Sequence, residues 1–498
     1  MSDAWERLLP KLEEMRDIGH AIRLLMWDQA VMMPPKGNAG RASSLATLET
    51  LYHGRLVDPA VGDLLAELDD DPSLDTTRAA SVRVLRREYD RSTRVPEDLV
   101  RALATARAEA YQVWTEARPK SDFAMLEPYL AKLFELKKQE ADAIGYPVER
   151  YDALLDAFEP GATTADLERL FGDLVDGLKP VADAVLDAAG DPPGFLFDEF
   201  DEDRQRAFCE QLVTQLGFDM DAGRLDTSPH PFTIMIGLND VRQTTRTNRR
   251  QLLSSIYAAL HETGHALYEL GLPEELAGLP AGAVPSLGMH ESQSRLWENQ
   301  VGRSRPFTDY LLPELKRVFP EELGMLSPDE FHRGVNHPSH SLIRVEADEV
   351  TYNLHVVLRF RLELALFRDE LSVADLPAAW NDGMEANLGL RPSNDAEGVL
   401  QDMHWAIGSM GYFPTYTIGT LNAAAIFAAA RAGIDGLDDD LRAGDCTRLL
   451  AWLRDNVHAH AYLAPASELF ERITGGPLTV TPFLDYLRDK YAAIYDLP

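Results

Sequence analysis

The pattern of apolar and polar positions along the chain predicts a mostly α-helical protein. Between Trp5 and Met26, apolar residues recur at spacings of three and four, so they fall on one face of a helix. The same period predicts helices over 41–52, 126–144 and 252–270. Helical patterns continue to the C-terminus, and helices therefore dominate the expected fold.

Local signals mark several helix ends. The segment 77–118 is expected to form two helices divided at Val95, because a residue that precedes proline avoids the α region. Gly145 is expected to close the helix before it. Thr163, followed three residues later by Asp166, is a suitable helix start.

One segment has a different pattern. Residues 230–236 and 240–245 indicate two short strands joined by a turn at 237–239. No repeat period and no flexible linker is evident along the chain. We therefore predict a single, mostly helical unit over residues 1–498, built as one lobe or two.

The composition narrows the class of protein. Asp and Glu number 81 against 48 Lys and Arg, so the formal net charge is −33, which argues against nucleic-acid and acidic-membrane partners. The longest apolar stretch, around 421–430, is too short to span a bilayer. The two cysteines, Cys209 and Cys446, exclude a disulfide framework, and the N-terminus lacks an apolar signal segment. We expect a cytoplasmic protein.

The acid excess has two explanations. Most of the basic charge is Arg, and acidic runs such as 69–71 and 438–440 lie in expected loops. Such a surface is one way to keep a protein soluble at high salt. An ordinary solvated acidic surface explains the same pattern, and the sequence leaves both explanations open.

The segment that carries chemistry is His261-Glu262-Thr263-Gly264-His265, inside the helix predicted over 252–270. Two histidines four positions apart lie one turn apart on one helical face, so both imidazoles can reach one ion. Glu262 is displaced around the helix and can act on water without binding the ion. This HExxH pattern indicates a catalytic zinc site.

A catalytic zinc takes three protein ligands and keeps one position open. The third ligand is expected in the helix-like segment 288–299. Glu291, Glu298 and His290 are rivals for this role, because spacing alone does not choose among them.

Six short motifs follow one another along the chain. They are His230–Phe232 (HPF), Asp240–Thr244 (DxRxT), His261–His265 (HExxH), His290–Gln293 (HESQ), Ile343–Asp348 (IRxxAD) and Gly398–Trp405 (GxxQDxHW). In this order they resemble the carboxypeptidase Taq family of thermostable metallocarboxypeptidases, which is gluzincin-like. The resemblance extends over nearly the whole chain, since Trp27 and the residues around it also match.

The resemblance implies a fold, a reaction and a ligand set. The fold would be a large helical metallopeptidase with a deep active-site groove and a small β-sheet beside the zinc helix. His261, His265 and Glu291 would bind one Zn²⁺ per chain, for which Co²⁺ can substitute, and Glu262 would be the general base. The enzyme would release C-terminal amino acids from peptides with broad specificity, accept proline poorly and form a homodimer.

Further catalytic groups are expected after position 400. A tetrahedral oxyanion needs donors beyond the metal. His404 and Tyr416 are candidates, because related helical metallopeptidases pair a histidine with a downstream tyrosine. Tyr412 competes with Tyr416 for this role.

A carboxypeptidase must recognise a free carboxylate, which suits the two-pronged guanidinium of arginine. Arg344 and Arg242 are the candidates. Arg344 is expected to lie in an apolar-flanked helical stretch, where an internal ion pair with Asp348, Glu346 or Asp240 is the alternative. Asp240, Arg242 and Thr244 are expected to form a supporting network, and Asp402 and Asp348 to orient imidazoles.

His458 and His460 are two positions apart and point to different helical faces, so they are expected to lie at the surface or near substrate.

Two other functions share parts of this pattern. A helical zinc endo-oligopeptidase or dipeptidyl carboxypeptidase would keep the zinc site without requiring the free carboxylate. A non-catalytic peptide-binding protein with a structural zinc would have no need of Glu262.

Overall fold

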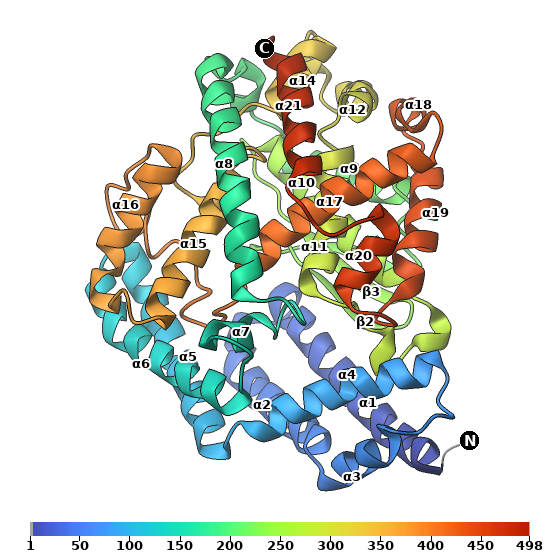
Figure 1. Ribbon diagram of the computed structural model, residues 1–498. Helices are drawn as coiled ribbons and strands as arrows, with labels where there is room; N and C mark the ends of the chain where they lie inside the picture. The colour runs from blue at the N-terminus through green and yellow to red at the C-terminus, as the bar shows by residue number, and fades with distance from the viewer. Residues whose placement is uncertain (1–2, 498) are drawn as a thin grey trace.

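The computed structural model describes residues 3–497. It is 69% helical and has one small sheet, which confirms the prediction of a mostly α-helical fold. Four N-terminal helices pack around a small apolar core at the bottom of Figure 1. Their bounds are α1 Asp3–Val31, α2 Asn38–Leu56, α3 Pro59–Leu68 and α4 Thr76–Arg94.

Five more helices follow; the helix ends that the sequence predicts among them lie close to the observed ones, whereas the helices Arg150–Leu155 and Glu202–Gln215 were not predicted. The five are α5 Glu97–Lys120, α6 Phe123–Ile144, α7 Arg150–Leu155, α8 Thr164–Ala189 and α9 Glu202–Gln215. The break between α4 and α5 falls at Val95 and Pro96, as predicted. Gly145 ends α6 with a φ of 83°, and the Thr163 hydroxyl accepts the N–H of Asp166 at the start of α8.

The sheet has three strands rather than the two expected. They are β1 Gly223–Thr227, β2 Thr233–Gly237 and β3 Asp240–Thr245, in the order β1-β3-β2. The two expected strands are present and antiparallel, although the first begins only at Thr233. β1 was missed because its sequence, GRLDT, lacks apolar alternation; it becomes a strand by pairing in parallel with β3.

The C-terminal half is again helical. Its α-helices are α10 Leu252–Leu270, α11 Leu287–Arg295, α12 Arg305–Val318, α13 Pro320–Leu323, α14 Pro328–Val335, α15 Tyr352–Phe367, α16 Leu376–Leu388, α17 Pro414–Gly433, α18 Leu437–Ala443, α19 Thr447–Asn456, α20 Ala466–Thr474 and α21 Thr481–Tyr495. A π-helix spans Leu296–Val301, and short 3₁₀ turns span Pro35–Gly37, Gly194–Phe197, Glu274–Leu276, Pro280–Gly282, Arg344–Glu346, Val373–Asp375 and His458–His460.

Helix α17 joins the two larger apolar cores, and it runs through the middle of Figure 1. Ile418 and Leu421 belong to the core that contains α6, α8 and α15. Ile426 and Phe427 belong to the core that contains α10, α12 and α19. Because one buried helix supplies both cores, we propose that the described residues, 3–497, fold as a single unit with two lobes.

Two segments interrupt the helices that the sequence predicts to continue to the C-terminus. Residues 336–351 and 389–413 contain mainly turns and irregular backbone. The prediction that Arg344 lies in a helical stretch is therefore wrong, since only a 3₁₀ turn forms there. The polar groups of these segments compete with helical hydrogen bonding, as Asp348 shows by accepting the N–H groups of Val350 and Thr351.

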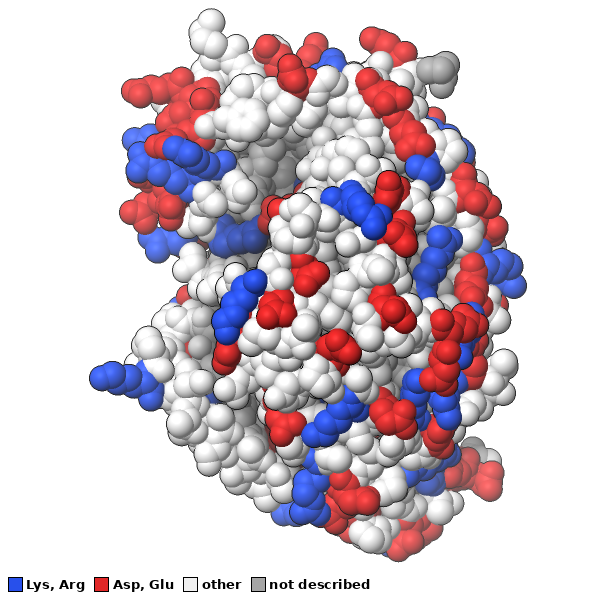
Figure 2. Space-filling view, turned by 90° about the vertical axis from the view of Figure 1, so that its left-hand side faces the viewer, with Lys and Arg blue, Asp and Glu red and all other residues white. Residues whose placement is uncertain are grey.

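The surface carries many charged side chains, as expected from a chain in which 26% of the residues are charged. Figure 2 shows acidic and basic side chains intermixed over one face, and a hollow near its upper edge whose walls are largely uncharged. Over residues 3–497, no single helix is long and apolar enough to cross a membrane; α17 and α18 pass that test only as a pair bent by 103°.

Candidate active site

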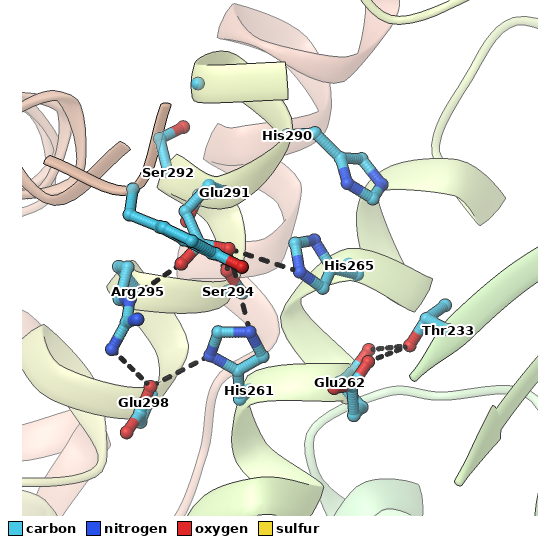
Figure 3. Close-up of polar contacts among 12 residues, drawn as sticks. Thr233, His261, Glu262, His265, His290, Glu291, Ser292, Ser294, Arg295 and Glu298 are labelled. Carbon is cyan, nitrogen blue, oxygen red and sulfur yellow. Dashed lines mark hydrogen bonds and ion pairs between the residues drawn. The ribbon is translucent and has the colours of Figure 1, made fainter. Parts of the chain in front are cut away.

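The two histidines of the HExxH pattern lie where the helical period places them. Their ring centroids are 5.0 Å apart on one face of α10, whose bounds coincide with the predicted helix. The side chains of His261 and His265 are 21% and 12% exposed, so one edge of the pair remains open. Figure 3 shows both imidazoles directed toward α11.

Helix α11 supplies the third group of the cluster. Ser286 caps its N-terminus by accepting the N–H of Met289. One turn later, Oε2 of Glu291 lies 3.6 Å from Nε2 of His261 and 3.5 Å from Nε2 of His265. We name His261, His265 and Glu291 the metal cluster, because their ligand atoms all lie within 4.8 Å of one another.

Glycines allow α11 to approach both of its neighbours closely. A Cβ at Gly264 on α10 would lie 2.6 Å from the Cα of Ser294. A Cβ at Gly419 on α17 would lie 2.5 Å from the Cβ of Glu291. Because real Cβ atoms do not approach so closely, glycine at these two positions sets the location of the carboxylate.

The other two rivals for the third ligand take different places. Oε2 of Glu298 in the π-helix lies 2.9 Å from Nδ1 of His261, behind the metal cluster. His290 stacks on His265 at a centroid distance of 4.1 Å, and its Nε2 lies 3.1 Å from Oε1 of Glu269. Glu298 is therefore placed to orient an imidazole, a role that the sequence suggested for other acids.

The electrostatics of the metal cluster favour a cation. Burial opposes a charge on His261, but the carboxylates of Glu291 and Glu298 outweigh it and raise the pKa of this imidazole to about 9. Burial, followed by the neighbouring His290, lowers the pKa of His265 to about 3. Nδ1 of His265 has no hydrogen-bond partner among the described residues.

The donor set fits the metal that the sequence implied. Two imidazole nitrogens and one carboxylate oxygen are the ligands of catalytic zinc in one well-known class of site. The carboxylates of Glu291 and Glu298, which raise the pKa of His261, would also favour a divalent ion at this cluster. The metal cluster can therefore hold one such ion through Nε2 of each histidine and Oε2 of Glu291.

Glu262 lies beside the metal cluster and outside it. Its side chain is 6% exposed, and the hydroxyl of Thr233 on β2 donates to Oε2 over 2.7 Å. Burial raises the pKa of this carboxyl. The small sheet thus contributes directly to the site, and Thr233 is a residue that the motif analysis missed although it directly follows His230–Phe232.

A second group, which we name the arginine cluster, consists of Arg344, Arg359 and Asp402. Nη2 of Arg344 donates to Oδ1 of Asp402 over 2.7 Å, and Nε of Arg359 donates to Oδ2 over 2.6 Å. The two guanidinium groups hold the pKa of Asp402 well below its usual range, although burial opposes them. The cluster is buried and carries one surplus positive charge.

Arg344 does have an internal partner, but not one of the three that were expected. Asp348 accepts hydrogen bonds from Ser339 and Thr351 instead. Arg359 was missed by the sequence analysis, although a charged residue inside the apolar helix Tyr352–Phe367 is a signal that could have found it.

His404, Tyr412 and Tyr416 come together next to the arginine cluster. Nε2 of His404 lies 3.2 Å from the hydroxyl of Tyr416, and the rings of Tyr412 and Tyr416 are 5.2 Å apart. The guanidinium of Arg344 lies 4.9 Å from the centre of the Tyr416 ring. Burial lowers the pKa of His404 to about 4, so its imidazole is neutral near pH 7.

Arg242 is held on β3 by different neighbours. Its Nε and Nη2 donate to Asp240 over 2.8 and 2.9 Å, and its guanidinium lies 4.3 Å from the ring centre of Trp27. The hydroxyl of Thr244 lies 2.7 Å from that of Ser228. These contacts connect β3 to Trp27 on α1 and to Ser228, which follows β1.

The expectation that His458 lies at the surface or near substrate is wrong. Its side chain is fully buried, and its Nε2 lies 3.1 Å from Oε1 of Gln293. Helical spacing indicates only how residues of the same short segment are oriented relative to one another. It does not reveal the contact with Gln293 on α11, which is far away in the sequence.

The chain is similar to known proteins over nearly its whole length. The family model for "Carboxypeptidase Taq (M32) metallopeptidase" matches residues 7–491. Thermostable carboxypeptidase 1 of Thermus thermophilus is 43% identical to this chain, and 99% of each is covered. The crystal structure of the M32 carboxypeptidase from Deinococcus radiodurans R1 matches with a TM-score of 0.97 at 40% identity, over 100% of both chains. A Pyrococcus furiosus carboxypeptidase structure has a TM-score of 0.96 at 36% identity, over 99% of both chains.

These matches extend over the whole chain, and they confirm the expected enzyme class over the two alternative functions. The candidate metal cluster lies within the matched residues. The chain therefore belongs to the carboxypeptidase Taq (M32) metallopeptidase family, and it is a metallocarboxypeptidase.

Proposed function

We propose that the protein is a zinc-dependent carboxypeptidase that binds one Zn²⁺ per chain at the metal cluster. The observation that carries this proposal is the convergence of two imidazoles and one carboxylate within 4.8 Å, beside the buried Glu262. His₂Glu is a zinc donor set with room for a further ligand. Co²⁺ prefers similar ligands and is the expected substitute.

When bound, such an ion supplies Lewis acidity, which polarises the scissile carbonyl and lowers the pKa of water. Glu262 is the proposed general base: it takes the proton from the attacking water and passes it to the leaving amine. Thr233 holds the carboxylate in place through Oε2. Burial keeps this proton transfer away from bulk solvent.

We propose that His404 and Tyr416 stabilise the oxyanion of the tetrahedral intermediate. Each can donate a hydrogen bond into a partly water-excluded site, where such donors are strongest. Their mutual distance of 3.2 Å supports a shared role. Tyr412 is the competing donor, since its ring is in contact with that of Tyr416.

We propose that the arginine cluster recognises the substrate carboxylate, with Arg344 as the contacting residue. Asp402 neutralises only one of two buried guanidinium groups, and the remaining positive charge lies beside Tyr416. An anionic C-terminus would compensate that charge. Arg242 is the alternative, although its partner Asp240 already offsets its charge one to one.

The proposed substrates are peptides with a free C-terminus. We expect broad specificity, with proline accepted poorly. We also propose, from the family resemblance, that the protein is a cytoplasmic homodimer. The two cysteines are buried and free, which suits a reducing compartment.

An assay with N-blocked dipeptides tests the proposal. The purified protein should release the C-terminal amino acid, lose activity on treatment with a chelator and regain it with stoichiometric Zn²⁺. A C-terminally amidated copy of the same peptide should be a poor substrate. Activity that survives complete metal removal would contradict zinc dependence, and equal cleavage of the amide would contradict recognition of the free carboxylate.

A further inference from the structure

Arg295, the last residue of α11, touches both acids of the metal site. Its side chain is 13% exposed. Nε donates to Oε1 of Glu291 over 2.8 Å, and Nη1 donates to Oε2 of Glu298 over 3.3 Å. The ring centre of Tyr352 lies 4.3 Å from its guanidinium carbon. Figure 3 shows Arg295 between the two carboxylates.

The contact with Arg295 gives the two carboxylate oxygens of Glu291 different roles. Oε1 is engaged by the guanidinium. Oε2 faces Nε2 of both histidines and also accepts the hydroxyl of Ser294 over 3.0 Å. Only Oε2 is therefore directed toward the position of an ion.

The contact with Glu298 acts on the opposite side of the site. Oε2 of Glu298 lies 2.9 Å from Nδ1 of His261 and also accepts from Arg295. A proton on Nδ1 leaves Nε2 as the nitrogen with a free lone pair, directed toward Glu291. Arg295 thus closes a chain of contacts that runs from one ligand of the metal cluster to another.

We propose that Arg295 is a positioning residue for the metal cluster: it makes Glu291 a ligand through one oxygen, and it holds Glu298 against His261. The proposal rests on the ligand set given under "Proposed function". Arginine suits the task because its rigid fork reaches two carboxylates in fixed directions, whereas the ammonium of lysine is a single point of charge.

Positioning and simple electrostatics predict opposite results for this residue. Removing a positive charge from beside a cation site should strengthen metal binding, because like charges repel. Removing a group that orients ligands should weaken it, by about 10- to 100-fold for such outer contacts. The sign of the change therefore separates the two effects.

The test measures the affinity of the full-length protein for Zn²⁺ by competition with a chromophoric chelator. Wild type is compared with Arg295→Ala, Arg295→Lys and Arg295→Gln, and the melting temperature of each is recorded. Arg91→Ala is the matched control, since Arg91 is a similarly enclosed arginine, 19% exposed, that pairs with Asp156 on another part of the chain. His261→Ala tests the ligand set itself.

We expect Zn²⁺ affinity to fall about 10- to 100-fold in Arg295→Ala, less in Arg295→Lys, and not at all in Arg91→Ala. Unchanged or tighter binding in Arg295→Ala overturns the positioning role. If that variant does not fold, wild-type affinity in both Arg295→Lys and Arg295→Gln overturns it equally.

The same experiment separates this proposal from the one on which it rests. Wild-type Zn²⁺ affinity in His261→Ala would overturn the ligand set. Loss of affinity in His261→Ala, together with full affinity in Arg295→Ala, would overturn only the role of Arg295.

Discussion

The metal cluster and the arginine cluster reach their geometry by different routes. Backbone proximity places the metal ligands: α11 lies against α10 at Gly264 and against α17 at Gly419, so Glu291 meets two histidines already fixed one turn apart. Buried charge places the other cluster, in which Asp402 draws together Arg344, 58 positions away in the sequence, and Arg359, 43 positions away.

This difference predicts which kind of substitution each cluster tolerates. At the metal cluster, α10, α11 and α17 pack so closely that no space remains for an added methyl group. The buried arginine cluster already carries one surplus positive charge, so losing its carboxylate would be costly, because each further uncompensated guanidinium away from water destabilises the fold. We therefore expect volume changes to damage the metal cluster and charge changes to damage the arginine cluster.

The largest effect should come from Glu262→Gln. The amide cannot take a proton, so turnover of N-blocked dipeptides should fall about 10²- to 10⁴-fold while Zn²⁺ content stays that of the wild type. Glu269→Gln is the control, since Glu269 lies on the same helix and contacts His290. Near-normal turnover of Glu262→Gln would contradict the proposed base.

Asp402→Asn tests the importance of charge in the arginine cluster. Losing the carboxylate leaves two buried guanidinium groups uncompensated, and stability should fall by about 3–5 kcal/mol. Asp156→Asn is the matched control: Asp156 also lies between two arginines, but its side chain is 30% exposed against 10% for Asp402. Thermal unfolding of both variants should show the larger loss in Asp402→Asn, and equal losses would refute the argument.

Arg344→Ala should change substrate preference. A bidentate contact with a carboxylate contributes about 1.5–3 kcal/mol, so kcat/KM for free-acid peptides should fall about 10- to 100-fold. Cleavage of the C-terminal amides should barely change, and Arg344→Lys should recover only part of the loss.

The alternative arginine provides the control for that result. If the preference for the free acid survives in Arg344→Ala and disappears in Arg242→Ala, the carboxylate site belongs to Arg242. Preserved preference in both variants would remove the two arginines from this role.

Gly419→Ala should weaken Zn²⁺ binding by about tenfold, because the new methyl group would displace Glu291 while all three ligands remain. Gly172→Ala is the control, since nothing lies within 4 Å of a Cβ at that helical position. It should leave Zn²⁺ affinity unchanged and raise stability by about 0.5–1 kcal/mol. Chelator competition and thermal unfolding measure the two quantities, and equal metal affinities would contradict the packing argument.

The smallest effect concerns the surface rather than either cluster. If the net charge of −33 reflects adaptation to salt, the melting temperature should rise from low to molar KCl, because salt screens repulsion among carboxylates. A flat or falling curve would favour an ordinary acidic surface.

The sequence by itself determined the parts of this protein that depend on local spacing. The helical period placed α10 at Leu252–Leu270, and the pair His261 and His265 needed only one helical turn to face the same side. Proline and glycine marked the breaks around α5 and α6 because they act on their own backbone. The motif series was sufficient to indicate the family.

Only the tertiary structure decided which partners meet across long distances in the sequence. Glu291 and Glu298 are equivalent by spacing, and the close approach of α11 to α10 placed one among the ligands and the other behind His261. β1 is a strand only because β3 lies beside it. Arg359 acquires its role from Asp402, which a separate segment brings to it. Helical periodicity is a property of consecutive residues, whereas burial and charge compensation depend on the neighbours that the fold supplies.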